Sequence, residues 1–216
     1  MNNKKTTLGI LILTSALTMS LRVNAQSVKI GNQEWMTKNM NVSTFRNGDA
    51  IQNAQTAEEW KKAGDNEQPA WCYFENDPEN EEKYGKLYNF YAVKDPRGLA
   101  PAGWHVPSDE EWATLTAFLG VAGTKMKSKS GLGENNDNNN GISFPGLPGG
   151  SRSDNGNFYA IGEYSYWWSS TESHTPHGCT RPISYYSCHL MRNYLNNNIG
   201  FSVRCLSSDM SILKKQ

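Results

Sequence analysis

The sequence predicts an α+β fold in which short helices pack on irregular antiparallel strands joined by long loops. Helical patterns lie in the first half of the chain, whereas short strands and turns fill the part after Ile142. Helices and strands that are segregated along a chain are typical of the α+β class. The chain contains 19 Gly and only 37% hydrophobic residues, while 7 Trp, 10 Tyr and 7 Phe supply large apolar side chains. We therefore expect long ordered loops around a core built mainly from aromatic rings.

The first 25 residues have the pattern of a secretory signal peptide. Lys4 and Lys5 give a positively charged start, residues 8–21 are largely apolar, and a small-residue site ends at Ala25. The alternative is a buried helix or a membrane anchor, but Thr and Ser interrupt an apolar core that is short for a membrane span. We therefore expect cleavage before Gln26 and export to the periplasm, the cell surface or the medium.

Cleavage changes the charge of the chain. Residues 1–25 contain three of the 21 basic residues and none of the 21 acidic ones, so the mature chain has 18 basic and 21 acidic residues and a net charge of about −3. Without a basic patch, nucleic acid is not an expected partner. The mature chain is long enough for one well-packed domain, and no stretch after residue 26 is apolar enough for a membrane span. The oligomeric state stays open.

The first elements of the mature chain follow from local patterns. Val28–Met36 alternates polar and apolar residues around an Asn-Gln turn, which predicts a strand or hairpin. Thr56–Ala63 predicts a short amphipathic helix that is anchored by Trp60 and ends at Gly64.

Two further elements are expected before the middle of the chain. Ala70–Phe74 is rich in aromatic side chains and predicts a strand. In Tyr84–Val93 the apolar residues recur at helical spacing, so Leu87, Phe90 and Tyr91 share one face of a predicted helix.

The stretch Pro101–Leu119 carries the strongest local signal. Ser108 stands three residues before Glu111, which is the spacing of a capping box, where each side chain bonds the backbone amide of the other residue. We therefore expect a helix that begins at Ser108 and ends before Gly120. The apolar residues at helical spacing in it are Trp112, Leu115, Phe118 and Leu119.

The second half of the chain is expected to contain loops and short strands. A brief helix at 124–130 precedes an Asn-rich and Gly-rich loop at 131–141. After Ile142 the pattern changes to short strands and turns, and residues 200–206 predict a buried closing strand. We expect the two ends of the mature chain to meet in the fold.

Several segments together carry a family resemblance: WCYFENDPENEEKYGKLYNFYAV (71–93), GWHVPSDEEW (103–112), FPGLPGGSR (144–152) with YWWSSTE (166–172), and GFSVRC (200–205). They resemble the Fibrobacter succinogenes major paralogous domain, a family of secreted bacterial proteins. The resemblance implies a single domain over residues 26–208, with 209–216 as a C-terminal tail. The GWHVP, GGS and closing GFSVRC segments also resemble, more distantly, the formylglycine-generating enzyme superfamily. That likeness implies a C-type-lectin-like fold.

The four cysteines predict disulfide bonds, because an even number of cysteines in an exported chain is typical of bridges. Four cysteines allow three connectivities. The family resemblance implies the pair Cys72 and Cys205, which leaves Cys179 and Cys188 as a local bridge on a late loop.

A catalytic alternative comes from the more distant resemblance. Formylglycine-generating enzymes carry a reactive, copper-binding cysteine pair soon after the Gly-Gly-Ser segment, with a shorter spacing than Cys179 and Cys188 have here. Neither thiol therefore matches the pattern of that superfamily, although soft thiolates are suitable copper ligands. We expect a structural bridge, no catalytic residue and no enzymatic activity. An oxidase or modifying enzyme that uses Cys179 and Cys188 is the alternative.

One loop resembles a calcium site in composition. Residues 134–141 are rich in Asn and Asp but lack the terminal Glu and the regular acidic alternation of an EF-hand. A solvated loop is the preferred interpretation, and Ca²⁺ stays an alternative because some lectin-like families bind it. No other metal or cofactor is expected.

The late aromatic residues are the candidate ligand-binding residues: Tyr164, Tyr166, Trp167, Trp168, Tyr185 and Tyr186. Aromatic faces can stack on sugar rings, whereas the alternative is that these rings form the core. Successive residues of a strand face opposite ways, so at least one face of 166–168 is expected in the core. We expect a non-enzymatic binding or adhesion module for polysaccharide, a cell-surface glycan or another envelope polymer.

Overall fold

The fold is described from a computed structural model of the chain, which describes residues 26–119, 144, 146–174, 176–184 and 190–209. The predicted signal peptide, the helix at 124–130 and the loop at 131–141 lie outside these residues. The elements in chain order are β1 (Ser27–Ile30), β2 (Gln33–Met36), β3 (Gln52–Asn53), α1 (Ala57–Asp65), β4 (Ala70–Cys72), the 3-10 helix η1 (Phe74–Asn76), α2 (Asn80–Tyr84), β5 (Leu87–Tyr88), α3 (Phe90–Val93), β6 (Trp104–His105), α4 (Asp109–Leu119), β7 (Gly149–Arg152), β8 (Phe158–Ile161), β9 (Tyr164–Glu172), β10 (His177–Ser184), β11 (Asn193–Asn196) and β12 (Leu206–Ser207).

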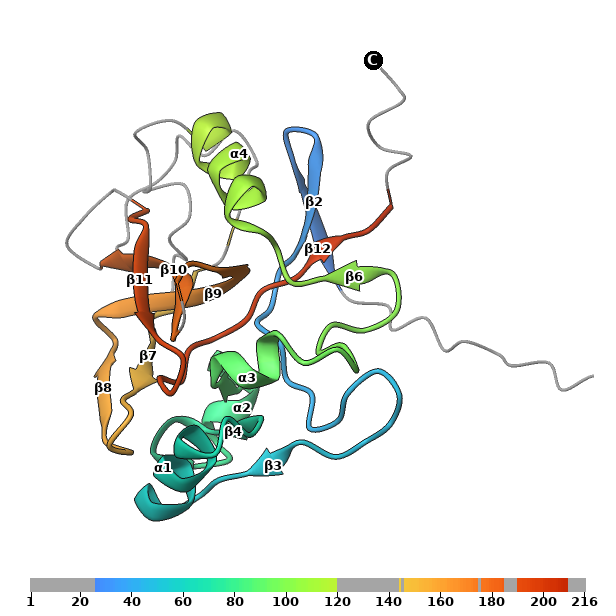
Figure 1. The fold of residues 1–216 in the computed structure, drawn as a ribbon. Helices are drawn as coiled ribbons and strands as arrows, with labels where there is room; N and C mark the ends of the chain where they lie inside the picture. Colours follow the sequence, from blue (N-terminus) through green and yellow to red (C-terminus); the bar gives the residue numbers. More distant parts are fainter. Residues whose placement is uncertain (1–25, 120–143, 145, 175, 185–189, 210–216) are drawn as a thin grey trace, which may run out of the picture.

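Small sheets and a few short helices form a mixed α+β fold, so the predicted class is confirmed (Figure 1). The strand orders are β1-β2-β12-β6, β11-β10-β9, β3-β4-β5 and β7-β8. Neighbouring strands run antiparallel in these sheets, apart from the parallel pair β3–β4. Among the described residues, no helix has the length and apolar character needed to cross a membrane.

The two ends of the described chain meet in one sheet, as the sequence predicts. Leu206 of β12 pairs with Trp35 of β2 on one side and with His105 of β6 on the other. Figure 1 shows β12 between the blue N-terminal hairpin and β6. The predicted hairpin is present, but Ile30 pairs with Gln33 across a turn at Gly31 and Asn32, one residue earlier than the expected Asn-Gln turn.

Residues 200–206 are buried, as predicted, but they do not form one continuous strand. The segment makes single bridges to successive neighbours, with Phe201 opposite Tyr88 and Ser202 opposite Trp167. It then accepts backbone hydrogen bonds from Met40, at 2.7 Å, and from Met36, at 3.0 Å. Because each residue pairs with a different element, regular strand structure begins only at β12. The segment therefore ties the sheets and helices together through the centre of the fold.

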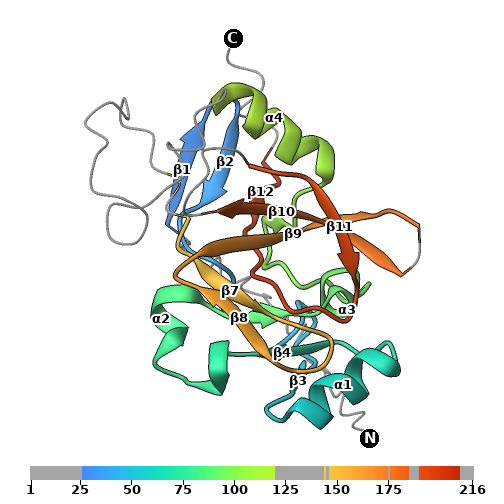
Figure 2. The same ribbon diagram turned by 90° about the vertical axis from the view of Figure 1, so that its left-hand side faces the viewer.

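Helix α4 begins with the predicted capping box. The Glu111 amide donates to Ser108 Oγ at 3.2 Å, and the Ser108 amide donates to Glu111 Oε2 at 2.8 Å. Trp112 is fully buried, whereas the Phe118 side chain is 53% exposed and lies over the backbone of Gly31. Figure 2 shows α4 beside the upper end of the β1–β2 hairpin and above the β9–β10 pair. The buried side chains of α4 share one core cluster with residues of both pairs, among them Trp35 and Trp167.

Helix α1 also starts with a capping box, in addition to the one expected at Ser108. The Thr56 hydroxyl accepts from the Glu59 amide at 3.1 Å, and Glu59 Oε2 accepts from the Thr56 amide at 3.0 Å. Trp60 is 1% exposed and donates its indole N–H to the carbonyl oxygen of Asn198 at 3.0 Å. The prediction of an α1 helix anchored by Trp60 is confirmed, although the helix continues one residue past Gly64 to Asp65.

The predicted helix over 84–93 is wrong for its first part. Leu87 and Tyr88 form strand β5, so the helical residues of this range are Tyr84, at the end of α2, and Phe90–Val93. The amide of Tyr88 donates to the carbonyl oxygen of Phe201 at 2.9 Å, so pairing with the closing segment takes the place of helical hydrogen bonds. The Asn89 side chain then caps α3 by accepting from the Ala92 amide at 3.1 Å.

The core consists of three clusters of buried side chains, and aromatic rings contribute to each of them. Strand β9 lies between two of these clusters. Trp168 belongs to the first, with Phe90 and Phe201, whereas Trp167 belongs to the second, with Trp112. The prediction of an aromatic core is confirmed.

Candidate functional site

Trp167 and Trp168 are not available for ligand binding. Both residues are 0% exposed. Trp168 packs edge-on against Phe90, and Trp167 stacks on Trp112. The indole N–H of Trp168 is also used, because it donates to the carbonyl oxygen of Tyr88 at 2.8 Å. The prediction that these two tryptophans contact a ligand is wrong, because β9 is covered on both faces.

Tyr164 and Tyr166 lie at the edge of this core. Their rings stack on each other with centroids 5.5 Å apart, and Tyr166 stacks on Phe201 at 4.8 Å. Both tyrosines are half-buried, so they keep some surface that a ligand can reach. Tyr185 and Tyr186 lie outside the described residues.

The cysteines are not bridged in the part of the chain that the structure describes. Cys72, Cys179 and Cys205 are free and buried, and Cys188 lies outside the described residues. The predicted Cys72–Cys205 bond is therefore a wrong prediction. The physical reason is that the two residues lie in different core clusters, Cys72 with α1 and Cys205 with the central rings.

The buried thiols are also poorly suited to thiolate chemistry. Burial raises the pKa of Cys72 to about 11 and that of Cys205 to about 12. Burial, with a hydrogen bond to Asp109, raises the pKa of Cys179 to about 11. Because the thiolate is the reactive and metal-binding form, the thiol of Cys179 is held in its inert form at neutral pH. The structure places no group of three or more His, Cys, Asp or Glu side chains of the described residues where they could hold a metal ion.

A polar pocket lies where α2 faces the segment after β2. It has a volume of about 410 Å³ and is called here the α2 pocket. Gly85 permits the close approach, because its φ is +72° and a side chain there would lie 2.7 Å from the carbonyl oxygen of Met40. The polar residues that line it include Asn39, Asn41, Glu79, Glu81, Glu82 and Lys83.

Asn39 forms the inner part of the α2 pocket and is fixed by the core. Its Oδ1 accepts from Trp167 Nε1 at 2.9 Å and from Arg204 Nε at 3.0 Å. Its Nδ2 donates to the carbonyl oxygen of Tyr84 at 2.8 Å, at the end of α2. Hydrogen bonds with three segments therefore hold this amide in one orientation.

A second network holds the wall of the α2 pocket. Lys86 Nζ donates to Asn41 Oδ1 at 2.7 Å and to Glu81 Oε1 at 3.3 Å. The Lys86 side chain is 4% exposed, and its ammonium lies 4.5 Å from the ring of Trp71 and 5.1 Å from that of Tyr73. Cation–π attraction and hydrogen bonds together compensate for burying this charge. Hydrogen bonds from Asn41 and Lys86 lower the pKa of Glu81, so it is a carboxylate at neutral pH.

The α2 pocket thus presents amides and carboxylates that are already oriented. An amide both donates and accepts, and a carboxylate accepts two or more hydrogen bonds, so such groups match ligands that carry several hydroxyls. None of these residues is among the ligand-binding candidates expected from the sequence. From the sequence, only the polar residue types could have pointed to this site. Asn39 and Asn41 are about 40 positions from Glu81, and no motif connects them.

The comparisons with known proteins give a family. The model of the Fibrobacter succinogenes major domain matches residues 28–207. No curated protein matches the chain, and no solved structure matches it. These comparisons do not support the predicted likeness to formylglycine-generating enzymes. The match covers the N-terminal hairpin, the α2 pocket and the closing strand, and the chain belongs to the Fibrobacter succinogenes major domain family.

Proposed function

We propose that the chain is an exported binding module for polysaccharide or another hydroxyl-rich envelope polymer. The signal-peptide pattern of residues 1–25 supports export. The meeting of the N-terminal hairpin and β12 in one sheet supports a C-type-lectin-like scaffold for the module. We propose the α2 pocket as its binding site.

The network of Asn41, Glu81 and Lys86 is the observation that carries this proposal. These side chains are oriented before any ligand arrives, so binding costs little side-chain entropy. Sugar hydroxyls both donate and accept hydrogen bonds, and the carboxylate of Glu81 beside the amide of Asn41 offers an acceptor and a donor at adjacent positions. A few oriented polar groups in a concave site are typical of specific ligand pockets.

The stacked Tyr164 and Tyr166 offer a second surface for the same class of ligand. Aromatic faces supply apolar contact to sugar rings, whereas the α2 pocket supplies hydrogen bonds. The two surfaces can be separated by substitution, because Tyr164 lies on β9 and Glu81 lies on α2.

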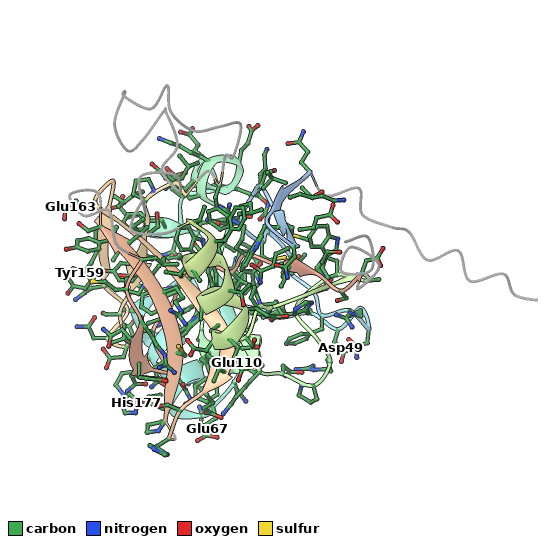
Figure 3. All side chains as sticks on the ribbon, turned by 90° about the horizontal axis from the view of Figure 1, so that it is seen from above. Asp49, Glu67, Glu110, Tyr159, Glu163 and His177 are labelled. Atoms are coloured by element: carbon green, nitrogen blue, oxygen red, sulfur yellow. The ribbon has the colours of Figure 1, made fainter. Side chains whose placement is uncertain are left out.

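A glycan array with the mature chain, residues 26–216, tests the proposal, followed by calorimetry on each glycan that binds. We expect Glu81→Gln to weaken binding about 10–100-fold, the equivalent of one hydrogen bond to a charged group. The control is Glu163→Gln, which changes an exposed carboxylate at the edge of the molecule (Figure 3) and should leave the affinity unchanged. The unfolding midpoint of each variant shows whether the fold is retained.

Two results would contradict the proposal. If no glycan or envelope polymer binds, the binding function is wrong. If a glycan binds equally well to wild type and Glu81→Gln but is lost with Tyr164→Ala, the function stands and the α2 pocket is the wrong site.

A further inference from the structure

A second cleft lies where α4 meets the sheet of the two chain ends. It has a volume of about 380 Å³, and His105 of β6, Glu111 of α4 and Ser208, just after β12, all line it. None of these residues belongs to the α2 pocket. The cleft therefore brings a hydroxyl, an imidazole and a carboxylate from three elements to one place.

The three side chains form a continuous hydrogen-bond chain. His105 Nε2 lies 2.9 Å from Glu111 Oε1, and His105 Nδ1 lies 3.0 Å from Ser208 Oγ. A carboxylate can only accept, so the neutral imidazole carries its proton on Nε2 and points the lone pair of Nδ1 at the serine hydroxyl. This is the tautomer that can take a proton from Ser208.

Backbone contacts hold Ser208 and Glu111 in place on either side of His105. The amide of Ser208 donates to the carbonyl oxygen of Gly103 at 2.9 Å, which fixes the serine beside β6. The second oxygen of Glu111 accepts from the Ser108 amide at 2.8 Å. Although burial acts against the charged form, hydrogen bonds from His105 and the Ser108 amide lower the pKa of Glu111. The carboxylate therefore stays ionised and oriented toward the imidazole.

We propose that Ser208, His105 and Glu111 form an esterase site for short-chain acyl esters. Ser208 Oγ attacks the ester carbonyl carbon while its proton moves to His105 Nδ1. The bond from that carbon to the alcohol oxygen then breaks, and the alcohol leaves with the proton. Water next attacks the acyl-serine and gives its proton to His105, after which the carboxylic acid leaves and Ser208 regains its proton. His105 is the general base and acid, and Glu111 is a positioning residue.

Asn32 lines the same cleft and can serve the developing oxyanion. Its side-chain amide carries two N–H donors. A side-chain amide is a known type of oxyanion donor. A Ser-His-acid group is recognised by geometry and not by order in the chain, so the absence of a Gly-x-Ser-x-Gly motif does not bear on this site.

A fluorophosphonate probe tests the proposal directly, because it phosphonylates a serine only where a base activates the hydroxyl. The full mature chain is treated with the probe and the labelled peptide is mapped by mass spectrometry. We expect labelling at Ser208, none in Ser208→Ala, and hydrolysis of p-nitrophenyl acetate that falls about 10²–10⁴-fold in His105→Gln. The control is Ser170→Ala, because Ser170 is an exposed serine of β9 that does not line this cleft.

The wild-type result decides the proposal even if a variant fails to fold. Absence of label at Ser208, under conditions in which a reference serine esterase labels fully, would overturn it. Labelling that is equally fast in folded His105→Gln would also overturn it, because the hydroxyl would then need no base. The site is independent of the α2 pocket, so neither result bears on glycan binding.

Discussion

The indole nitrogen of Trp167 donates a hydrogen bond to Asn39 Oδ1 at 2.9 Å across 128 positions of sequence. Trp167 is fully buried, whereas Asn39 lines the α2 pocket. The tryptophan therefore acts on the proposed binding site from inside the core, by orienting an amide, and not by contact with a ligand.

Trp167→Phe should lower the free energy of unfolding by about 1–3 kcal/mol. The change removes the hydrogen bond to Asn39, worth about 0.5–1.5 kcal/mol, and leaves a small cavity beside Trp112. Urea denaturation measures the effect. Tyr164→Phe is the control, because it removes only a hydroxyl from a half-buried ring. An equal or larger loss in Tyr164→Phe would contradict this assignment.

Ser108→Ala should cost about 1 kcal/mol through the lost helix cap. The Ser108 hydroxyl accepts from the Glu111 amide, and no such bond can form with alanine. The urea midpoint should fall, whereas Ser170→Ala, at an exposed position of β9, should leave it unchanged. An unchanged midpoint in Ser108→Ala would show that the cap contributes nothing to stability.

Trp112→Ala should be among the most damaging changes in α4. Trp112 packs 4.7 Å from Trp35 and 5.9 Å from Trp167, measured between ring centroids, so truncation should cost about 3–5 kcal/mol. Phe118→Ala on the same helix should cost much less, because 53% of that residue is already exposed. Thermal unfolding of both variants gives the comparison, and similar losses would mean that the inward face of α4 is misassigned.

The cysteine assignment predicts a specific thiol count. In exported Cys188→Ser protein, three thiols should react with Ellman's reagent after unfolding and very little before it, because Cys72, Cys179 and Cys205 are buried and protonated. A Cys72–Cys205 bond would leave one thiol in the unfolded chain. Fast reaction of Cys179 in the native protein would instead favour the oxidase alternative.

The stability of the fold should depend on Asp95 at low pH. Hydrogen bonds from the Arg97 side chain lower the pKa of Asp95 below its ordinary 3.8. A carboxyl whose pKa is lower in the folded state stabilises the fold above its unfolded pKa, and this stabilisation is lost as the pH falls through the folded value. The urea midpoint should therefore fall less steeply below about pH 4 in Asp95→Asn than in wild type. Asp154→Asn, at an exposed turn, is the control and should follow wild type.

The sequence by itself determined the elements that depend on neighbouring residues. The capping box of Ser108 and Glu111, the helix around Trp60 and the N-terminal hairpin all follow from spacings of a few residues, and each is present in the structure. The α+β class and the aromatic core follow in the same way from composition and order. Local hydrogen bonds and side-chain periodicity decide these features, and both can be read from a short stretch of chain.

Tertiary structure decided what depends on distant pairs. Leu87 and Tyr88 are in a strand because the backbone of Tyr88 pairs with Phe201, and no local pattern reports a partner more than 100 residues away. The burial of both Trp167 and Trp168 is likewise decided by tertiary packing. In an isolated two-faced strand, one of these indoles would face the core and the other would face solvent. Here a second cluster covers the other face of β9, so both are buried. The α2 pocket and the hydrogen-bonded group of Ser208, His105 and Glu111 also exist only after folding. In each case residues near the end of the polypeptide meet residues from much earlier in the sequence.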